Sequence, residues 1–177
     1  ADARKEIDPP LESRAVYVFT QQELIEALEG VIPDIGQFEF DDPASREGVF
    51  VFNRMSDGWP IFDIHLELYY SDQKIMAYKK DVIDILPADN AKEERVLPAA
   101  KALASLVENY LPDGSAVKDI RLGYHGQFFD ATTQISTPSW RVLLESGEVY
   151  YVHAISGEVA TDQDEPAETT ASGENGG

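Results

Sequence analysis

Cysteine is absent from this chain of 177 residues, and so is any hydrophobic run long enough to cross a membrane. The first absence excludes disulfides, thiolate catalysis and zinc sites built on cysteine, while it leaves the cellular compartment open. No segment approaches the run of about 18 apolar residues that marks a transmembrane helix. The N-terminus, ADARKEIDPP, has neither the basic region nor the apolar core of a signal peptide, and it lacks an initiator methionine. We therefore expect the sequence to be trimmed from a longer protein, with an N-terminal anchor as the segment removed.

Basic residues are scarce. The chain has 14 Lys and Arg against 33 Asp and Glu, which gives a formal net charge of -19. Such a field repels nucleic-acid phosphates and anionic lipid headgroups, so no nucleic acid is expected as a partner. The excess suits a cationic ligand or a metal, or it serves only as a solubilising surface. Hydrophobic residues make up 43% of the chain, which indicates a folded core in one large domain or two small ones.

Recognised catalytic motifs are also missing. The sequence contains no G-x-S-x-G, no glycine-rich phosphate-binding loop, no H-E-x-x-H and no EF-hand spacing. The carboxylate pairs Asp41-Asp42 and Glu93-Glu94 are adjacent, and adjacent strand residues point to opposite faces, so both are poor candidates for acid–base catalysis. The histidines lie in separate β-like segments without the short spacing of metal ligands: His65, His125 and His153. We expect no catalytic residue, no cofactor and no structural metal.

Short β-rich runs separated by turn residues dominate the N-terminal part of the chain. In IHLELYY, residues 64–70, apolar and polar side chains alternate, and Ser71-Asp72-Gln73 turns the chain into KIMAY, which predicts an antiparallel hairpin. Thr20 and Glu23 form a capping box that opens a short helix over residues 21–29, closed by Gly30. The other predicted strands are AVYVFT at 15–20, QFEF at 37–40, GVFVFNRM at 48–55 and KIMAYKKDV at 74–82.

An amphipathic helix opens the C-terminal part of the chain and ends near Leu111. Two starts are open: near Asn90, where Pro98 would kink the helix, or near Val96, where Pro98 lies in the first turn without harm. In the strand region that follows, glycines at 123 and 126 are predicted to mark a bulge or loop. Within the predicted amphipathic helix, apolar residues follow one another at steps of three and four residues: Val96, Ala100, Leu103, Val107 and Tyr110.

The stretch SWRVLLESGEVYYVHAISGEV, residues 139–159, predicts a further hairpin. If Ser146-Gly147 is a two-residue turn, Trp140 and Tyr151 share a buried apolar face. The opposite face is mixed, carries Tyr150, and is free to meet solvent or a partner. The predicted facing pairs are Trp140 with His153, Val142 with Tyr151, and Leu144 with Val149.

These patterns together predict an α+β fold with two small antiparallel sheets, each associated with a helix. We expect a linker at residues 1–13, a first subdomain at 14–88, a second subdomain at 92–160 and a mobile acidic tail at 161–177. The tail lacks Lys, Arg and large apolar groups, so it offers little to offset the entropy cost of ordering, about 1–2 kcal/mol per residue.

Several segments, taken in order, carry a resemblance to a known family. These are Y…KIMAY at 70–78, the helix at about 96–111, RLGYHGQ at 121–127, TQISTPSWRV at 133–142 and VYYVHAISGEV at 149–159. Their order and spacing resemble the YycI (WalI) family over residues 64 to 160, and the final hairpin is also similar to the PepSY module. The family's N-terminal transmembrane helix is missing from this sequence, and residues 14–63 match only in general character.

The resemblance implies a non-catalytic regulator anchored in the cell membrane of a Gram-positive bacterium. Members of the family are found beside YycH and the sensor histidine kinase YycG, also called WalK, which controls cell-wall metabolism. The implied partners are a YycH-like protein and that kinase, with this chain on the extracytoplasmic face and the membrane reached only through a helix that the sequence lacks. Two alternatives stay open: a PepSY-like binder or inhibitor of a secreted peptidase, and an unrecognised hydrolase.

A partner-binding surface is predicted on the mixed face of the hairpin and in the loop around residues 124–129, because aromatic residues and glycines lie close together there. The residues predicted to make this contact are Tyr124, His125, Phe128, Phe129, Arg141, Leu143 and Tyr150.

Overall fold

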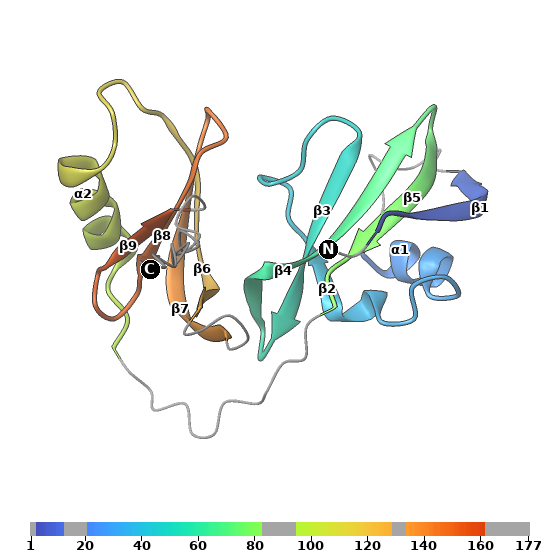
Figure 1. The fold of residues 1–177 in the computed structure, drawn as a ribbon, viewed down its shortest axis with the longest axis horizontal. Helices are drawn as coiled ribbons and strands as arrows, with labels where there is room; N and C mark the ends of the chain where they lie inside the picture. Colours follow the sequence, from blue (N-terminus) through green and yellow to red (C-terminus); the bar gives the residue numbers. More distant parts are fainter. Residues whose placement is uncertain (1–2, 13–20, 83–94, 129–133, 162–177) are drawn as a thin grey trace, which may run out of the picture.

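The computed structural model describes residues 3–12, 21–82, 95–128 and 134–161 of the chain. In these residues the chain forms two halves that lie side by side (Figure 1). The elements of the N-terminal half, residues 3–82, are β1 (Lys5–Glu12), α1 (Gln21–Leu28), η1 (Ile35–Gln37), β2 (Phe38–Phe40), β3 (Val49–Ser56), β4 (Trp59–Ser71) and β5 (Lys74–Lys80). The elements of the C-terminal half, residues 95–161, are α2 (Ala99–Asn109), β6 (Val117–Phe128), β7 (Gln134–Leu144), β8 (Val149–His153) and β9 (Val159–Thr161).

One sheet runs through both halves. Its main path is β1-β5-β4-β6-β7-β8-β9, and β3 pairs with β4 and with β2 beside that path. The strand pairs within each half are antiparallel, whereas β4 and β6 are parallel and paired only at Ile61 and Tyr124. The predicted α+β class is confirmed, and the two sheets that were expected to be separate are joined by this short parallel contact. In the described part of the chain, neither α-helix has the length and apolar character needed to span a membrane.

The N-terminal half packs around one face of β4. Ile64, Leu66 and Leu68 are each no more than 5% exposed, as the alternation along this strand predicts. Leu24 and Leu28 of α1 join the same cluster, because a spacing of four residues places both side chains on one side of the helix. The helix therefore covers this face of the sheet.

The C-terminal half packs its strands against α2. The helix begins at Ala99 with Pro98 at its N-cap, where proline has no helical hydrogen bond to lose. Residues 95–98 are not helical, so the chain follows the later of the two predicted starts. Leu106 of the helix is fully buried against Val142 and Val152. In Figure 1 α2 lies on the outer side of this half, away from the N-terminal half.

The predicted linker at residues 1–13 is wrong for residues 5–12, which form β1. This strand is antiparallel to β5, with Leu11 opposite Ile75. The apolar residues of the segment supply the physical reason: Ile7 is 6% exposed in the main core, and Leu11 packs against that core. Pro9 and Pro10 are tolerated because β1 is the edge strand, where a backbone N–H is not needed for a second neighbour.

The turn between β7 and β8 is one residue longer than predicted. Leu144 N donates to Glu148 O at 2.9 Å, and Gly147 N donates to Leu144 O at 3.0 Å. Residues 145–147 therefore form a three-residue loop. Gly147 has a φ of 91°, which is the left-handed conformation that such loops require at their last position.

This longer turn changes which residues share a face of the hairpin. Trp140 is opposite Val152 instead of His153, and Arg141 is opposite Tyr151. Side chains alternate between faces along a strand, so a shift of one residue moves one whole strand's set to the other side. The predicted common face of Trp140 and Tyr151 is therefore wrong. Trp140 faces α2, where its indole Nε1 donates to Leu97 O at 2.8 Å, while Tyr151 faces the N-terminal half.

Some of the sequence predictions fall outside the described residues. These are the strand at 15–20, the boundary between the two subdomains at 88–92, Phe129, and all of the acidic tail except residue 161. The division into subdomains at 14–88 and 92–160 stays a prediction.

Candidate functional site

The two halves meet through a buried ion pair. Arg141 of β7 extends from the C-terminal half to Asp41, which directly follows β2 in the N-terminal half. Its Nη2 donates to Asp41 Oδ1 at 3.0 Å, and its Nη1 donates to Asp41 Oδ2. Asn53 of β3 also donates to Asp41 Oδ2. Asp41 and Asn53 are fully buried and Arg141 is 4% exposed, so this polar cluster is part of the interior.

The pKa values of this pair are set by burial and mutual attraction. Burial would raise the pKa of the Asp41 carboxyl group, but the hydrogen bonds and charge of Arg141 outweigh it and hold the pKa below the ordinary value of 3.8. Burial would likewise lower the pKa of Arg141, whereas its hydrogen bonds to Asp41 raise it above the ordinary value. Both groups are therefore charged at neutral pH.

A second polar contact supports the same junction. His125 Nδ1 of β6 lies 2.9 Å from Asp63 Oδ1 of β4, and Gly126 N donates to Asp63 Oδ2 at 2.6 Å. The His125 ring stacks on Tyr151, with 3.6 Å between ring centroids and an interplanar angle of 3°. Tyr151 also contacts Phe62 of β4 at 6.0 Å between centroids. Side chains of β4, β6 and β8 thus pack together where the halves meet.

Gly123 allows β6 to approach β4 closely. A Cβ atom at this position would lie 2.5 Å from Pro60 O and 2.7 Å from the Phe62 ring, which no real side chain tolerates. The sequence predicts that Gly123 and Gly126 mark a bulge or loop, and this is wrong because both lie within the regular pairing of β6 with β7. The reason for Gly123 is the space between strands rather than backbone flexibility.

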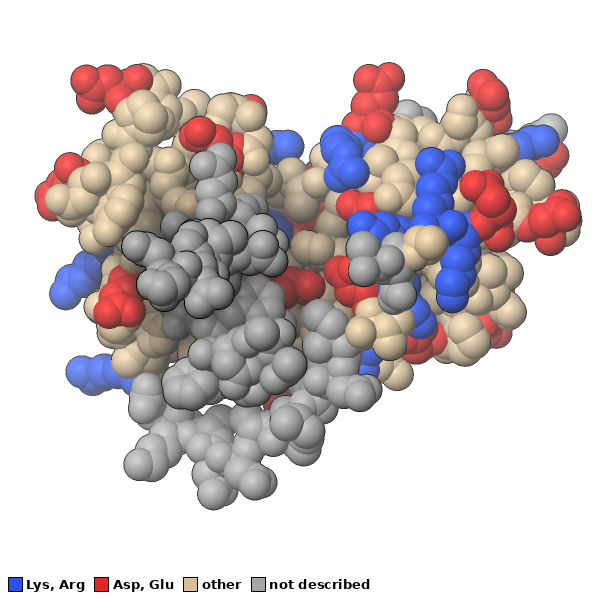
Figure 2. All heavy atoms as spheres, viewed as in Figure 1, with Lys and Arg blue, Asp and Glu red and all other residues tan. Residues whose placement is uncertain are grey.

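Exposed polar contacts lie at the edge of the junction. Arg121 Nη2 of β6 donates to Glu39 Oε1 of β2 at 3.0 Å, and Lys118 Nζ donates to Pro43 O at 3.0 Å. Solvent screens such contacts, so each adds little to stability. Figure 2 shows acidic side chains over both halves and a group of basic side chains on the N-terminal half.

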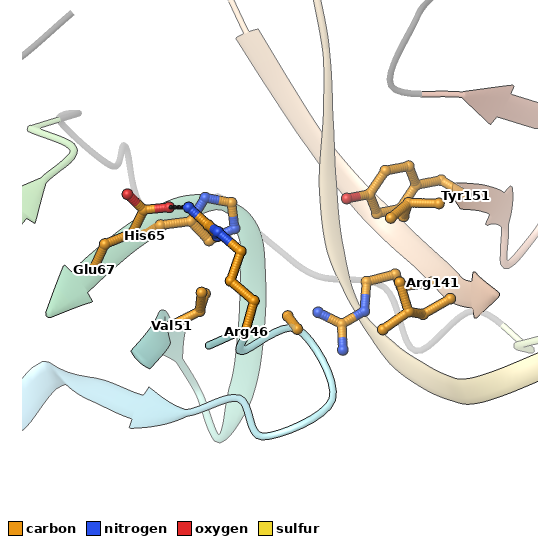
Figure 3. A pocket seen from close by; sticks show the side chains of 9 residues that line it. Arg46, Val51, His65, Glu67, Arg141 and Tyr151 are labelled. Carbon is orange, nitrogen blue, oxygen red and sulfur yellow. Dashed lines mark ion pairs between the residues drawn. The ribbon is translucent and has the colours of Figure 1, made fainter. Parts of the chain in front are cut away.

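A cavity of about 170 Å³ lies beside the buried ion pair, between the two halves. Figure 3 shows Arg46, His65 and Glu67 on one side, with Arg141 and Tyr151 extending toward them from the other. Arg46 Nη2 lies 3.5 Å from Glu67 Oε1. The lining residues of the N-terminal half are Ala44, Arg46, Val51, His65 and Glu67, and those of the C-terminal half are Arg141, Leu143, Val149 and Tyr151.

Four of the residues predicted to contact a partner lie at the junction: Tyr124, His125, Arg141 and Leu143. Arg141 and Leu143 are 4% and 6% exposed, and both line the cavity. The side chain of His125 is 14% exposed beside Asp63. The mixed face of the hairpin therefore packs against the N-terminal half of the same chain in this structure.

Tyr124 of β6 reaches across the junction, since it pairs with Ile61 and packs against the core of the N-terminal half. Tyr150 lies elsewhere, against the cluster beneath α2. Phe128 ends β6, and the structure does not describe its side chain; Phe129 falls outside the described residues. The described members of the set thus lie on both faces of the sheet and do not form one continuous surface.

Sequence reasoning missed the partners of Arg141. In sequence, Asp41 stands out only as a carboxylate adjacent to Asp42, and Asn53 lies within a predicted strand. One signal was present: Asn53 follows Val49 and Val51 on one face of β3, and a polar residue in a buried row needs a partner. The identity of that partner was not accessible, since Asp41 and Arg141 are 100 residues apart.

Comparisons with known proteins add a family match. The family model described as "YycI protein" matches residues 6–155 of the chain. No curated protein matches it. Among solved structures, the Bacillus megaterium YpeB C-terminal domain is similar, with a TM-score of 0.43 and 13% sequence identity over 81% of this chain. The match covers 65% of that other chain, so this chain spans slightly less than two thirds of its length.

Proposed function

Because the chain belongs to the YycI family, we propose that it regulates a YycFG-type (WalRK-type) two-component system by binding other proteins, without catalysis. The match over residues 6–155 is the observation that carries the proposal, since it includes both halves of the structure. In the finer form of the proposal, the domain lies on the extracytoplasmic face of the cell membrane of a Gram-positive bacterium. There it joins a YycH-like protein and adjusts the activity of a YycG-like (WalK-like) sensor kinase that controls cell-wall metabolism.

The structure of the junction supports a role without catalysis. Its strongest polar cluster, Asp41, Asn53 and Arg141, is almost fully buried and internally paired. Catalytic groups must reach a substrate, whereas these groups satisfy one another inside the chain. Their arrangement is that of a structural contact between two parts of one protein.

We place the contact with the YycH-like partner on the outer side of α2. Val107 and Tyr110 at the C-terminal end of this helix are three residues apart and are 55% and 51% exposed. Exposed apolar side chains that are close together often mark protein contacts. This surface replaces the predicted one, whose members Arg141 and Leu143 are buried.

The proposal is tested by co-purifying the full-length protein, with its membrane anchor, together with the YycH-like protein and the kinase of the same organism. We expect association with the YycH-like protein and a weaker association with the kinase. If neither the YycH-like protein nor the kinase is recovered, the proposal is contradicted, and the alternative of a PepSY-like binder of a secreted peptidase is favoured.

A pair of variants tests the surface itself. Val107→Ser with Tyr110→Ser should weaken recovery of the YycH-like protein, because both side chains are exposed and their loss leaves the core intact. Trp59→Ser is the matched control, since this aromatic residue is 46% exposed on the other half. Equal losses in the two variants would rule out α2 as the specific contact.

A further inference from the structure

The rim of the cavity between the halves carries one positive and one negative side chain. Arg46 is 58% exposed and lies 3.5 Å from Glu67, which is 21% exposed. The second carboxylate oxygen of Glu67 accepts a hydrogen bond of 2.5 Å from the Tyr69 hydroxyl, and this bond raises the pKa of Tyr69. Glu67 is therefore held in place, whereas the exposed guanidinium of Arg46 can move aside at little cost.

The charge of Arg141 is already compensated. Asp41 binds its guanidinium through both oxygens, and Asp119 Oδ2 lies 3.4 Å from Nη2. An anion that binds Arg46 would displace Glu67, the partner in its ion pair, and would bring a further negative charge into a protein with a net charge of -19. A simple cation would meet Arg46. A molecule that carries both charges on neighbouring atoms satisfies both rim residues.

Part of the cavity wall is apolar, beside the polar residues of the lining, and the space is small. Val51 and Leu143 are 5% and 6% exposed, and Val149 adds a third branched side chain. Ligand sites for drug-sized molecules occupy about 300–1,000 Å³, and this cavity has 170 Å³. Its volume suits a short aliphatic group and excludes large ligands.

We propose that this cavity binds a free α-amino acid with a short aliphatic side chain. The ligand carboxylate contacts Arg46, the ammonium contacts Glu67, and the side chain lies against Val51 and Leu143. Because the lining comes from both halves, the bound ligand stabilises their observed arrangement (Figure 3). The inference goes beyond the proposed regulatory function and does not depend on it, since it requires no partner protein.

The test is an amide NMR titration of the chain with L-valine, up to about 10 mM, a range suited to weak binding. Two matched probes each lack one charged group: 3-methylbutanoate has no ammonium, and 2-methylpropylamine has no carboxylate. We expect saturable shifts at Val51, Glu67 and Leu143 with valine, and weaker effects with either probe. No shift with valine, or equal shifts with all three compounds, would overturn the proposal.

Substitutions of the two charged residues at the rim of the cavity test the assigned roles. Arg46→Met and Glu67→Gln should each weaken valine binding by roughly tenfold, because each removes one charge contact. Arg54→Met and Glu47→Gln are the controls, since neither residue lines the cavity. The amide spectra of these two control variants should match that of the wild type, and their affinity for valine should be unchanged. Binding that survives both rim variants would place the ligand elsewhere and contradict the assignment.

Discussion

Arg141 and Asp41 are both removed from water, and each compensates the charge of the other. A buried charge without a partner costs far more than an exposed one, because the interior cannot solvate it. Asn53 fills a further hydrogen-bonding position on Asp41. An arrangement of the halves that separated the pair and kept either group buried would leave that charge unsatisfied.

Asp41→Ala should reduce the free energy of unfolding by about 3–5 kcal/mol, because it leaves the guanidinium of Arg141 buried without its partner. Urea denaturation measures this loss. Glu39→Ala is the control: it removes the exposed ion pair with Arg121 and should cost about 0–1 kcal/mol. Similar losses for the two variants would show that the buried pair has no special role.

The pH dependence of stability follows from the lowered pKa of Asp41. In the folded chain this pKa lies below the unfolded value, so the stabilisation is fully present above about pH 4 and is lost as pH falls through the folded pKa. The stability difference between wild type and Asp41→Asn should be constant near neutral pH and should shrink in acid. Urea denaturation at a series of pH values measures it. A difference that grows toward acid pH would contradict the sign of the shift.

Gly123→Ala should destabilise the chain by about 1–3 kcal/mol, because the added methyl group would overlap the Pro60 carbonyl and the Phe62 ring. The clash involves backbone, which cannot move aside as a flexible side chain would. Gly30→Ala is the control, since no atom lies within 4 Å of its added Cβ. Thermal unfolding of both variants checks this, and an unchanged midpoint for Gly123→Ala would mean that the strands are farther apart than described.

At the scale of elements, the hairpin of β7 and β8 depends on the left-handed residue in its loop. Gly147→Ala should cost about 1 kcal/mol, because alanine adopts a φ of 91° only with strain. The register itself can be read from cross-strand NOEs in the wild type, which should connect Trp140 with Val152. NOEs that place Trp140 directly opposite His153 would restore the two-residue turn and contradict the structure.

Local patterns predicted most described elements, whereas long-range contacts were not accessible. The alternation of Ile64, Leu66 and Leu68 identified the buried face of β4, and helical spacing identified α2. The hairpin register failed because Ser146-Gly147 fits a two-residue or a three-residue turn equally well in sequence. One residue of difference then moved the side chains of β8, including Tyr150, to the opposite face relative to those of β7. The burial of Arg141 and Leu143 has a different cause, since it comes from long-range packing against the N-terminal half, which local patterns do not reveal.

At the scale of the whole molecule, β4 and β6 connect the halves at only one paired position. Their arrangement depends on side chains: the Arg141 pair, the His125 contact with Asp63, and the close approach at Gly123. The cavity lies in the same junction. A ligand or partner that contacts both halves would therefore favour one arrangement, which gives a physical basis for the proposed regulation.

The proposed regulation of a two-component system can be measured in the organism that encodes this chain. Transcripts of wall-hydrolase genes controlled by the YycG-like kinase are quantified in a deletion strain and after complementation with the full-length gene. Deletion should change the transcript levels, the wild-type gene should restore them, and the Val107→Ser, Tyr110→Ser variant should restore them less well. Transcript levels that stay unchanged on deletion would contradict the proposed regulation.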